Sequence, residues 1–302
     1  MESDRFIKFG PFAGELEDTS CRICGTGTPA KPVYKSKEGI GYFRCQLCSL
    51  MYASPRFTGE SLARIYETSE FADLSLYENW SYDAWRQGRD RTYLVEQQKV
   101  AMVSRYLPKG ARILDVGCGT GLFVLEAEKN GYRCEGVEPS AMLARVGQEK
   151  LAVPVTNTTI NNFAPPCKFQ GLVIWDVLEH LYDPVAVLRR CADLLEDRGL
   201  IFVQVPHYRG LSEAYKIFLC RLGLRRSFKH FGFPWHVYSF DRTSLSFLMK
   251  KSGFEPLLFE SWSHLLKDGK TGLLTRAAIF LTRRLCLSDY LVCVARKAPV
   301  PV

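Results

Sequence analysis

A glycine turn that follows an acidic residue is the feature of this 302-residue chain that most restricts its fold. Residues 111–116 form an apolar run interrupted by Arg112 and Asp115, and they lead into Gly117-Cys118-Gly119-Thr120-Gly121. The apolar spacing of residues 122–129 then predicts a helix. A strand, a glycine turn and a helix form the entrance of a nucleotide-type βαβ unit. We therefore expect an α/β fold with a doubly wound, mostly parallel sheet.

Two acids indicate which ligand this turn serves. In dinucleotide sites a third glycine follows three residues after the second, but Leu122 occupies that place here. Asp115 would repel a pyrophosphate at the helix N-terminus, whereas it would attract an ammonium group and a sulfonium. Glu138 ends the next predicted strand, near the offset at which a carboxylate meets ribose hydroxyls. S-adenosylmethionine has all of these groups, so we expect it as the cofactor.

Three motifs carry a resemblance to a known family. They are Ile113-Leu114-Asp115-Val116-Gly117-Cys118-Gly119-Thr120-Gly121, Val137-Glu138-Pro139-Ser140 and Trp175-Asp176-Val177-Leu178-Glu179-His180-Leu181. Together they resemble class I S-adenosylmethionine-dependent methyltransferases, and the similarity covers residues 93–297. It implies a Rossmann-like sheet of seven strands with an antiparallel last strand. It also implies a cofactor site formed by Asp115, Gly117, Cys118, Gly119, Thr120, Gly121, Glu138, Pro139, Ser140, Asp176 and Val177.

The rest of the chain supplies elements in the order that this family implies. Helices are expected over residues 93–107, from Asp183-Pro184 onward, and from Asp241 to Lys251 before Gly253. Strands are expected over residues 171–175, 199–205, 255–259 and 290–295. One departure is Gln170-Gly171, where relatives usually show an acid followed by an apolar residue. The adenine contacts within residues 156–164 stay unassigned.

Four of the eleven cysteines have the spacing of a metal site. Cys21 and Cys24 form one Cys-x-x-Cys pair, and Cys45 and Cys48 form a second one. This is the layout of a four-thiolate structural zinc site. Gly25 permits the sharp turn after the first pair. Reduced thiols without a metal, or a redox pair, are the alternatives, and the other seven cysteines receive no role.

The cysteine pairs also sharpen the resemblance. With Ala53-Ser54-Pro55-Arg56 shortly after them, they are similar to the front end of sugar-modifying methyltransferases. Those enzymes generally carry a further C-terminal domain, whereas the last strand expected here, residues 290–295, lies close to residue 302. A sugar acceptor is therefore only loosely implied. We expect a zinc-ribbon-like segment over residues 1–60 and a linker with cofactor-covering helices over residues 61–92. The methyltransferase domain would span residues 93–302, with a basic and aromatic lid at residues 207–240.

A general base is the main chemical help that a methyltransferase can add, because the sulfonium already activates the methyl group. His180 follows the predicted fourth strand at the edge where open α/β sheets place ligands, and Glu179 precedes it. The ordinary pKa of histidine lies near neutrality, so His180 could take a proton from the acceptor. The alternative is a structural Glu-His pair that supports the cofactor pocket. His207 and His236 are the reserve bases.

The charge excess lies in the C-terminal third. The chain has 40 Lys and Arg against 32 Asp and Glu, and residues 207–240 alone carry six basic residues and the single acid Glu213. Basic and aromatic residues in this lid suit a phosphate-bearing glycan acceptor, nucleotide-linked or lipid-linked. The same composition suits peripheral membrane contact. A helical hairpin packed on the core is the simpler alternative.

Two further classes of function remain open. A zinc ribbon and a methyltransferase domain also occur together in ribosomal RNA methyltransferases, and the basic C-terminal third fits RNA. Residues 1–60 are nearly neutral, however, and nucleic acid is therefore the weaker partner. A non-catalytic binding or scaffold protein is the third class. No secretory signal and no run of eighteen apolar residues is readable, so we expect a cytoplasmic protein.

Overall fold

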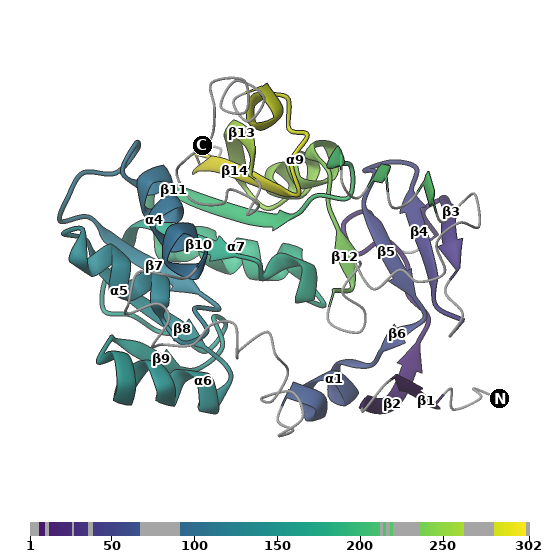
Figure 1. Ribbon diagram of the computed structural model, residues 1–302, viewed down its shortest axis with the longest axis horizontal. Coiled ribbons are helices and arrows are strands. Elements are labelled where there is room, and N and C mark those ends of the chain that lie inside the picture. Colours follow the sequence, from purple (N-terminus) through teal and green to yellow (C-terminus); the bar gives the residue numbers. More distant parts are fainter. Residues whose placement is uncertain are drawn as a thin grey trace.

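A seven-stranded sheet forms the centre of the computed structural model (Figure 1). The structure describes residues 6–9, 12–25, 27–35, 39–66, 91–211, 214–215, 218–219, 236–262 and 281–299. In spatial order the strands of the sheet are β13 (Phe254–Trp262), β14 (Tyr290–Lys297), β11 (Leu195–Pro206), β10 (Phe169–Trp175), β7 (Arg112–Val116), β8 (Arg133–Glu138) and β9 (Val155–Asn157). The last strand, β14, runs antiparallel to both of its neighbours. The expected seven-stranded, mostly parallel sheet is thus confirmed.

Both faces of this sheet are covered by helices. Side chains alternate between the faces of a strand, so Ile113, Val173 and Phe202 belong to a core under α4 (Arg91–Val103) and α5 (Leu122–Lys129). Leu114, Leu172 and Val203 belong to the other core, under α7 (Pro184–Leu194) and α9 (Arg242–Lys251). The short helix α6 (Ala141–Val146) follows β8. This two-sided burial is the physical reason for the long apolar runs in the sequence.

The helix boundaries follow local capping chemistry. Asp183 accepts a hydrogen bond from the Ala186 amide at 2.9 Å and begins α7. Asp241 and Ser244 form a reciprocal capping box at the start of α9, with bonds of 2.8 and 2.9 Å. After α9, Gly253 takes a φ of 86°, which favours glycine. The helix expected over residues 93–107 ends at Val103, four residues early, in a turn before Pro108.

The N-terminal residues form two small sheets beside the central sheet, drawn in purple on the right of Figure 1. One contains β1 (Phe6–Phe9), β2 (Phe12–Glu17) and β6 (Arg56–Phe57), and α1 (Gly59–Tyr66) follows it. The other has the order β12, β5, β4, β3, in which β5 spans Met51–Ser54, β4 spans Gly41–Cys45 and β3 spans Ala30–Lys35. Its edge strand β12 (Tyr238–Ser239) comes from the segment expected to be a lid. The end of that segment is therefore built into the N-terminal sheet, which the sequence did not predict.

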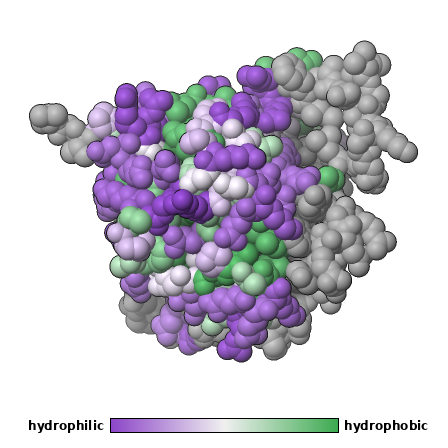
Figure 2. Space-filling model, turned by 90° about the vertical axis from the view of Figure 1, so that its left-hand side faces the viewer, coloured by the Kyte–Doolittle hydropathy of each residue, from purple (hydrophilic) through white to green (hydrophobic). Residues whose placement is uncertain are grey.

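Much of the expected lid, and most of the linker, lies outside the described residues. This applies to residues 67–90 and to most of the basic and aromatic side chains of the lid, namely Lys216, Arg221, Arg225, Arg226, Lys229, Phe231, Phe233 and Trp235. Within the described part, Leu211, Tyr215 and Phe218 are exposed. Figure 2 shows a different side, the one on which α4, α5 and α6 lie, and its described surface is mainly hydrophilic. Among the described residues, no helix combines the length and apolar character needed to cross a membrane.

Candidate active site

The glycine turn between β7 and α5 has the backbone of a ligand cradle. Gly117, Gly119 and Gly121 take φ angles of 73°, 57° and 80°, which favour glycine. A Cβ atom on Gly117 would lie 2.7 Å from Cγ2 of Val177, so the turn packs tightly against the segment after β10. At Gly119, by contrast, a Cβ atom would meet no atom within 4 Å among the described residues other than Gly119 and its two chain neighbours. Open space over Gly119 leaves room for a ligand against the backbone.

Glu138 links the end of β8 to this turn. Its Oε2 accepts a hydrogen bond from the Gly119 amide, and its Oε1 accepts one from the Ser140 amide, both at 2.9 Å. Burial raises the pKa of Glu138, although the two amide donors oppose this. Asn157 in β9, which the sequence analysis did not single out, donates to the carbonyl oxygens of Glu138 and Pro139. These contacts bring the ends of β7, β8 and β9 together around Glu138.

The remaining residues of the turn are neutral. Cys118 packs against Gly136, because a Cβ atom there would clash with its sulfur. Burial raises the pKa of the Cys118 thiol, so it stays protonated. Thr120 lies partly exposed in the turn, and Ser140 caps α6 by accepting the Leu143 amide at 3.5 Å. The predicted cofactor residues thus lie at or just after the ends of three strands, β7, β8 and β10.

Asp115 and Asp176 are acids at the ends of the neighbouring strands β7 and β10. Asp115 is only 2% exposed, and burial raises its pKa well above the usual range. Asp176 takes a left-handed φ of 57°, and its Oδ2 accepts a hydrogen bond from Nε2 of Gln204 at 2.7 Å. Burial raises the pKa of Asp176 to about 6, while Lys99 opposes the shift. Its Oδ1 is buried and has no hydrogen-bond partner among the described residues.

Glu179, His180 and His236 come together just beyond β10. One ligand atom from each lies within 4.8 Å of the others, and the two imidazole rings are 4.8 Å apart in an edge-on arrangement. The amide of Val237 donates to the carbonyl of Glu179 at 2.9 Å and so holds His236 at this place. Burial, with His180 nearby, lowers the pKa of His236 to about 3, so this ring is neutral. Glu179 is fully buried, and burial raises its pKa well above the usual range.

His207 lies apart from this group. It follows β11, bridges to Phe240, and its Nδ1 lies 3.2 Å from the carbonyl oxygen of Ser288. Burial lowers its pKa. Of the three candidate histidines, the structure brings two together and places the third in a packing position.

The four N-terminal cysteines form one cluster. Their sulfur atoms lie within 4.8 Å of one another, with 3.5 Å between Cys21 and Cys48 and 3.8 Å between Cys24 and Cys45. Zinc–sulfur bonds of about 2.3 Å in a tetrahedron place the sulfurs about 3.8 Å apart, so the cluster fits a zinc ion. Gly25 has a φ of 100°, and Ser49 takes the matching place after the second pair with a φ of 68°.

The cysteine cluster contacts the part of the molecule that holds Glu179, His180 and His236. Cys21, Cys45 and Cys48 belong to the same apolar core as α7 and α9. The amide of Ala53 donates to the carbonyl of Val237 at 3.1 Å, and Val237 in turn contacts Glu179. The Tyr208 hydroxyl lies 2.9 Å from Oδ2 of Asp241 and 3.1 Å from the carbonyl of Ser49. The cysteine knuckles therefore share contacts with the elements that hold His236.

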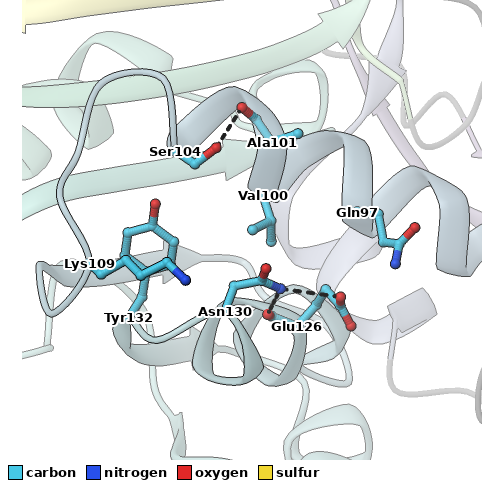
Figure 3. A pocket seen from close by; sticks show the side chains of 8 residues that line it. All are labelled: Gln97, Val100, Ala101, Ser104, Lys109, Glu126, Asn130 and Tyr132. Atoms are coloured by element: carbon cyan, nitrogen blue, oxygen red, sulfur yellow. Dashed lines mark hydrogen bonds between the residues drawn. The ribbon is translucent and has the colours of Figure 1, made fainter.

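A separate cavity of about 290 Å³ lies between α4 and α5 (Figure 3). Glu126 of α5 and Asn130, the residue that caps the end of α5, face it, and a hydrogen bond joins their side chains. None of the predicted site residues lines it; its lining consists of Gln97, Val100, Ala101, Ser104, Lys109, Glu126, Asn130 and Tyr132. It is distinct from the strand ends described above.

A family model described as "Methyltransferase domain" matches residues 83–258, more than half of the chain. The chain belongs to this methyltransferase family. As a family member it uses S-adenosylmethionine. The sugar-modifying branch expected from the sequence receives no support from this match.

Curated relatives and solved structures agree with the family. A ubiquinone biosynthesis O-methyltransferase of Xanthomonas campestris is 27% identical over 53% of this chain and 72% of its own length. One of Bradyrhizobium diazoefficiens is 33% identical over 31% of this chain, but the match spans only 39% of that relative.

Two solved structures with bound S-adenosylhomocysteine share the fold. Magnesium protoporphyrin IX methyltransferase of Synechocystis PCC 6803 has a TM-score of 0.54 at 15% identity, covering 79% of this chain and all of that one. The 1,6-didemethyltoxoflavin-N1-methyltransferase of Burkholderia thailandensis has a TM-score of 0.51 at 16% identity, covering 89% of this chain and all of that one.

Proposed function

We propose that this methyltransferase transfers a methyl group from S-adenosylmethionine to a hydroxyl group of a small-molecule acceptor, with His180 as the general base. The observation that carries the proposal is the place of the imidazole pair. Val177, two residues after β10, packs against Gly117, and His180 follows three residues later beside the neutral His236. The methyl acceptor must approach this edge of the sheet.

The proposed chemistry needs one proton transfer. S-adenosylmethionine supplies an activated methyl group, and the acceptor oxygen forms a bond to that carbon as the carbon–sulfur bond breaks. The hydroxyl proton would pass to a ring nitrogen of His180. His236 is uncharged, so it does not oppose the positive charge that forms on His180. The fully buried Glu179 would hold the first turn beyond β10 in place through its carbonyl bond to Val237.

The names of the relatives support an oxygen acceptor on a small molecule, since they are O-methyltransferases of ubiquinone biosynthesis. A glycan acceptor, phosphate recognition and membrane contact stay predictions, because the basic and aromatic lid residues behind them lie outside the described part of the chain. A structural zinc ion held by Cys21, Cys24, Cys45 and Cys48 is part of the proposal, supported by the sulfur geometry.

The experiment is a methyl-transfer assay with radiolabelled S-adenosylmethionine and three classes of acceptor: dihydroxylated aromatic compounds, nucleotide sugars and ribosomal RNA. We expect transfer to the aromatic hydroxyl compounds. For that acceptor, His180→Ala should lower kcat by about 10²- to 10⁴-fold, the usual contribution of a general base. Affinity for S-adenosylhomocysteine should be unchanged.

His207→Gln is the matched control, since His207 lies in a packing position and should keep most of the activity. Wild-type kcat in His180→Ala would reject the histidine base. Transfer to nucleotide sugars or RNA alone would reject the small hydroxyl acceptor while leaving the methyltransferase assignment intact.

A further inference from the structure

Lys99 of α4 is a buried cation on which three acids act, namely the buried Glu96 and Asp115 and the partly buried Asp176. Lys99 is 4% exposed, and its Nζ donates to Oε1 of Glu96, one helical turn earlier, at 2.9 Å. The ammonium also lies 5.6 Å from the centre of the Trp175 ring, at the end of β10. The Trp175 ring in turn packs 5.6 Å from Phe123, which follows the glycine turn. The ammonium group of Lys99 therefore points from α4 toward the strand ends at the glycine turn.

The charge of Lys99 acts on both acids of that site. Burial raises the pKa values of Asp115 and Asp176, and in each case Lys99 is the first influence that opposes burial. Burial alone would lower the pKa of Lys99, but Glu96, Asp176 and Asp115 raise it overall, so it stays charged. An unpaired carboxylate in such a place is costly and would take up a proton.

Several polar atoms around Lys99 also lack partners among the described residues. They are Oδ1 of Asp176, Oε2 of Glu96, Oε1 of Gln204 and the indole nitrogen of Trp175. Buried polar groups are normally hydrogen-bonded, so a set of unpaired ones indicates a missing ligand or water. An ammonium group beside Asp176 would supply donors to this set.

We propose that Lys99 is a positioning residue of the cofactor site, whose positive charge favours the carboxylate form of Asp176, so that the unpartnered Oδ1 of Asp176 can hold the α-ammonium group of S-adenosylmethionine. The inference rests on the proposed function, because it assumes that this ligand binds at the glycine turn. Neither the family match nor the motifs point to Lys99.

Other charged groups face this cluster from the surrounding elements. Glu96 lies on α4, and Arg105, two residues after the end of α4, is paired with Glu260 of β13 at 3.1 Å. Glu138 of β8 acts on Asp115, and Asp176 acts on Glu179. Glu96 disfavours a charged Asp176, so Lys99 is the group whose removal should matter most for that acid.

The test compares two ligands over a range of pH. S-adenosylhomocysteine carries the ammonium group, whereas 5′-methylthioadenosine lacks the whole amino acid part. In Lys99→Met the pKa of Asp176 should rise from about 6, so a higher pH is needed to ionise it. At pH 7 we expect a loss of about ten- to a hundredfold in affinity for S-adenosylhomocysteine, the effect of a nearby opposite charge. The loss should shrink as pH rises from 7 to 9, and affinity for 5′-methylthioadenosine should not change.

Two variants serve as controls. Lys99→Arg keeps the charge and should retain affinity and the wild-type pH profile. Lys109→Met removes a lysine that lines the separate cavity of Figure 3 and should bind both ligands as the wild type does.

Three results would overturn the inference: unchanged binding in Lys99→Met, an equal loss for both ligands, or a loss for S-adenosylhomocysteine that does not depend on pH. The last result would make Lys99 a direct ligand of the carboxylate. Wild-type protein that binds neither ligand would instead reject the proposed function.

Discussion

At the scale of single residues, the sequence predicted the acids of the cofactor edge but missed their counter-charge. Asp115 and Glu138 could be predicted because each has a set place in a strand–turn pattern. Glu96 and Lys99 have the spacing of an ordinary exposed helix pair. Within α4 the apolar residue Leu94 is 48% exposed, while Glu96 and Lys99 are buried. Which face of α4 meets the sheet depends on tertiary packing, and the spacing of apolar residues alone does not give it.

Glu138 provides the test at this scale. In Glu138→Gln one carboxylate oxygen becomes an amide NH₂, which would face the Gly119 or Ser140 amide instead of accepting its hydrogen bond. We expect the affinity for S-adenosylhomocysteine to fall by about ten- to a hundredfold, since hydrogen bonds to charged groups contribute about 1.5–3 kcal/mol. Isothermal titration calorimetry measures this. Glu135→Gln, on the same strand but paired with Arg112, is the control, and equal affinities of the two variants would contradict the role of Glu138.

At the scale of elements, caps and strands of the central sheet were predictable, whereas the pairing of β12 with β5 was not. The Asp183 and Asp241 caps are local, so their signals are visible in a few residues. The partners in the β5–β12 pair are Tyr52 and Tyr238, far apart in the chain, and β12 has only two residues. No periodicity can be read from so short a strand. Yet this pair connects the cysteine cluster to His236.

Loss of the cysteine cluster should therefore affect turnover more than cofactor binding. We expect wild-type protein to hold one zinc ion per chain by metal analysis and Cys45→Ser to lose it. The Tm of Cys45→Ser should lie about 5 °C or more below that of the wild type. A loss of about 1 kcal/mol of folding stability lowers Tm by roughly 2–4 °C in a domain of this size. Turnover should fall because β5 no longer holds Val237 and His236. Cys167→Ser, at an exposed cysteine, is the control. A folded, fully active Cys45→Ser variant without zinc would contradict this connection.

At the scale of the whole molecule, two distant parts of the chain share one apolar core around the strand ends. The N-terminal cysteines pack with α7 and α9, and the ammonium of Lys251 at the end of α9 donates to the carbonyl oxygen of Ile23. The sequence predicted separate segments because its composition changes between them, but contacts between segments leave no mark on composition. The seven-stranded sheet was predictable since its order follows from the family motifs.

S-adenosylmethionine should bind to this chain at the glycine turn, and titration of the purified 302-residue chain with S-adenosylhomocysteine measures this binding. We predict one ligand per chain, displaced by S-adenosylmethionine. Ligand at a hundred times its Kd should stabilise the folded protein by about 2.7 kcal/mol and raise its Tm accordingly. The absence of binding heat, together with an unchanged Tm at about 1 mM S-adenosylhomocysteine, the upper end of usual substrate KM values, would contradict it.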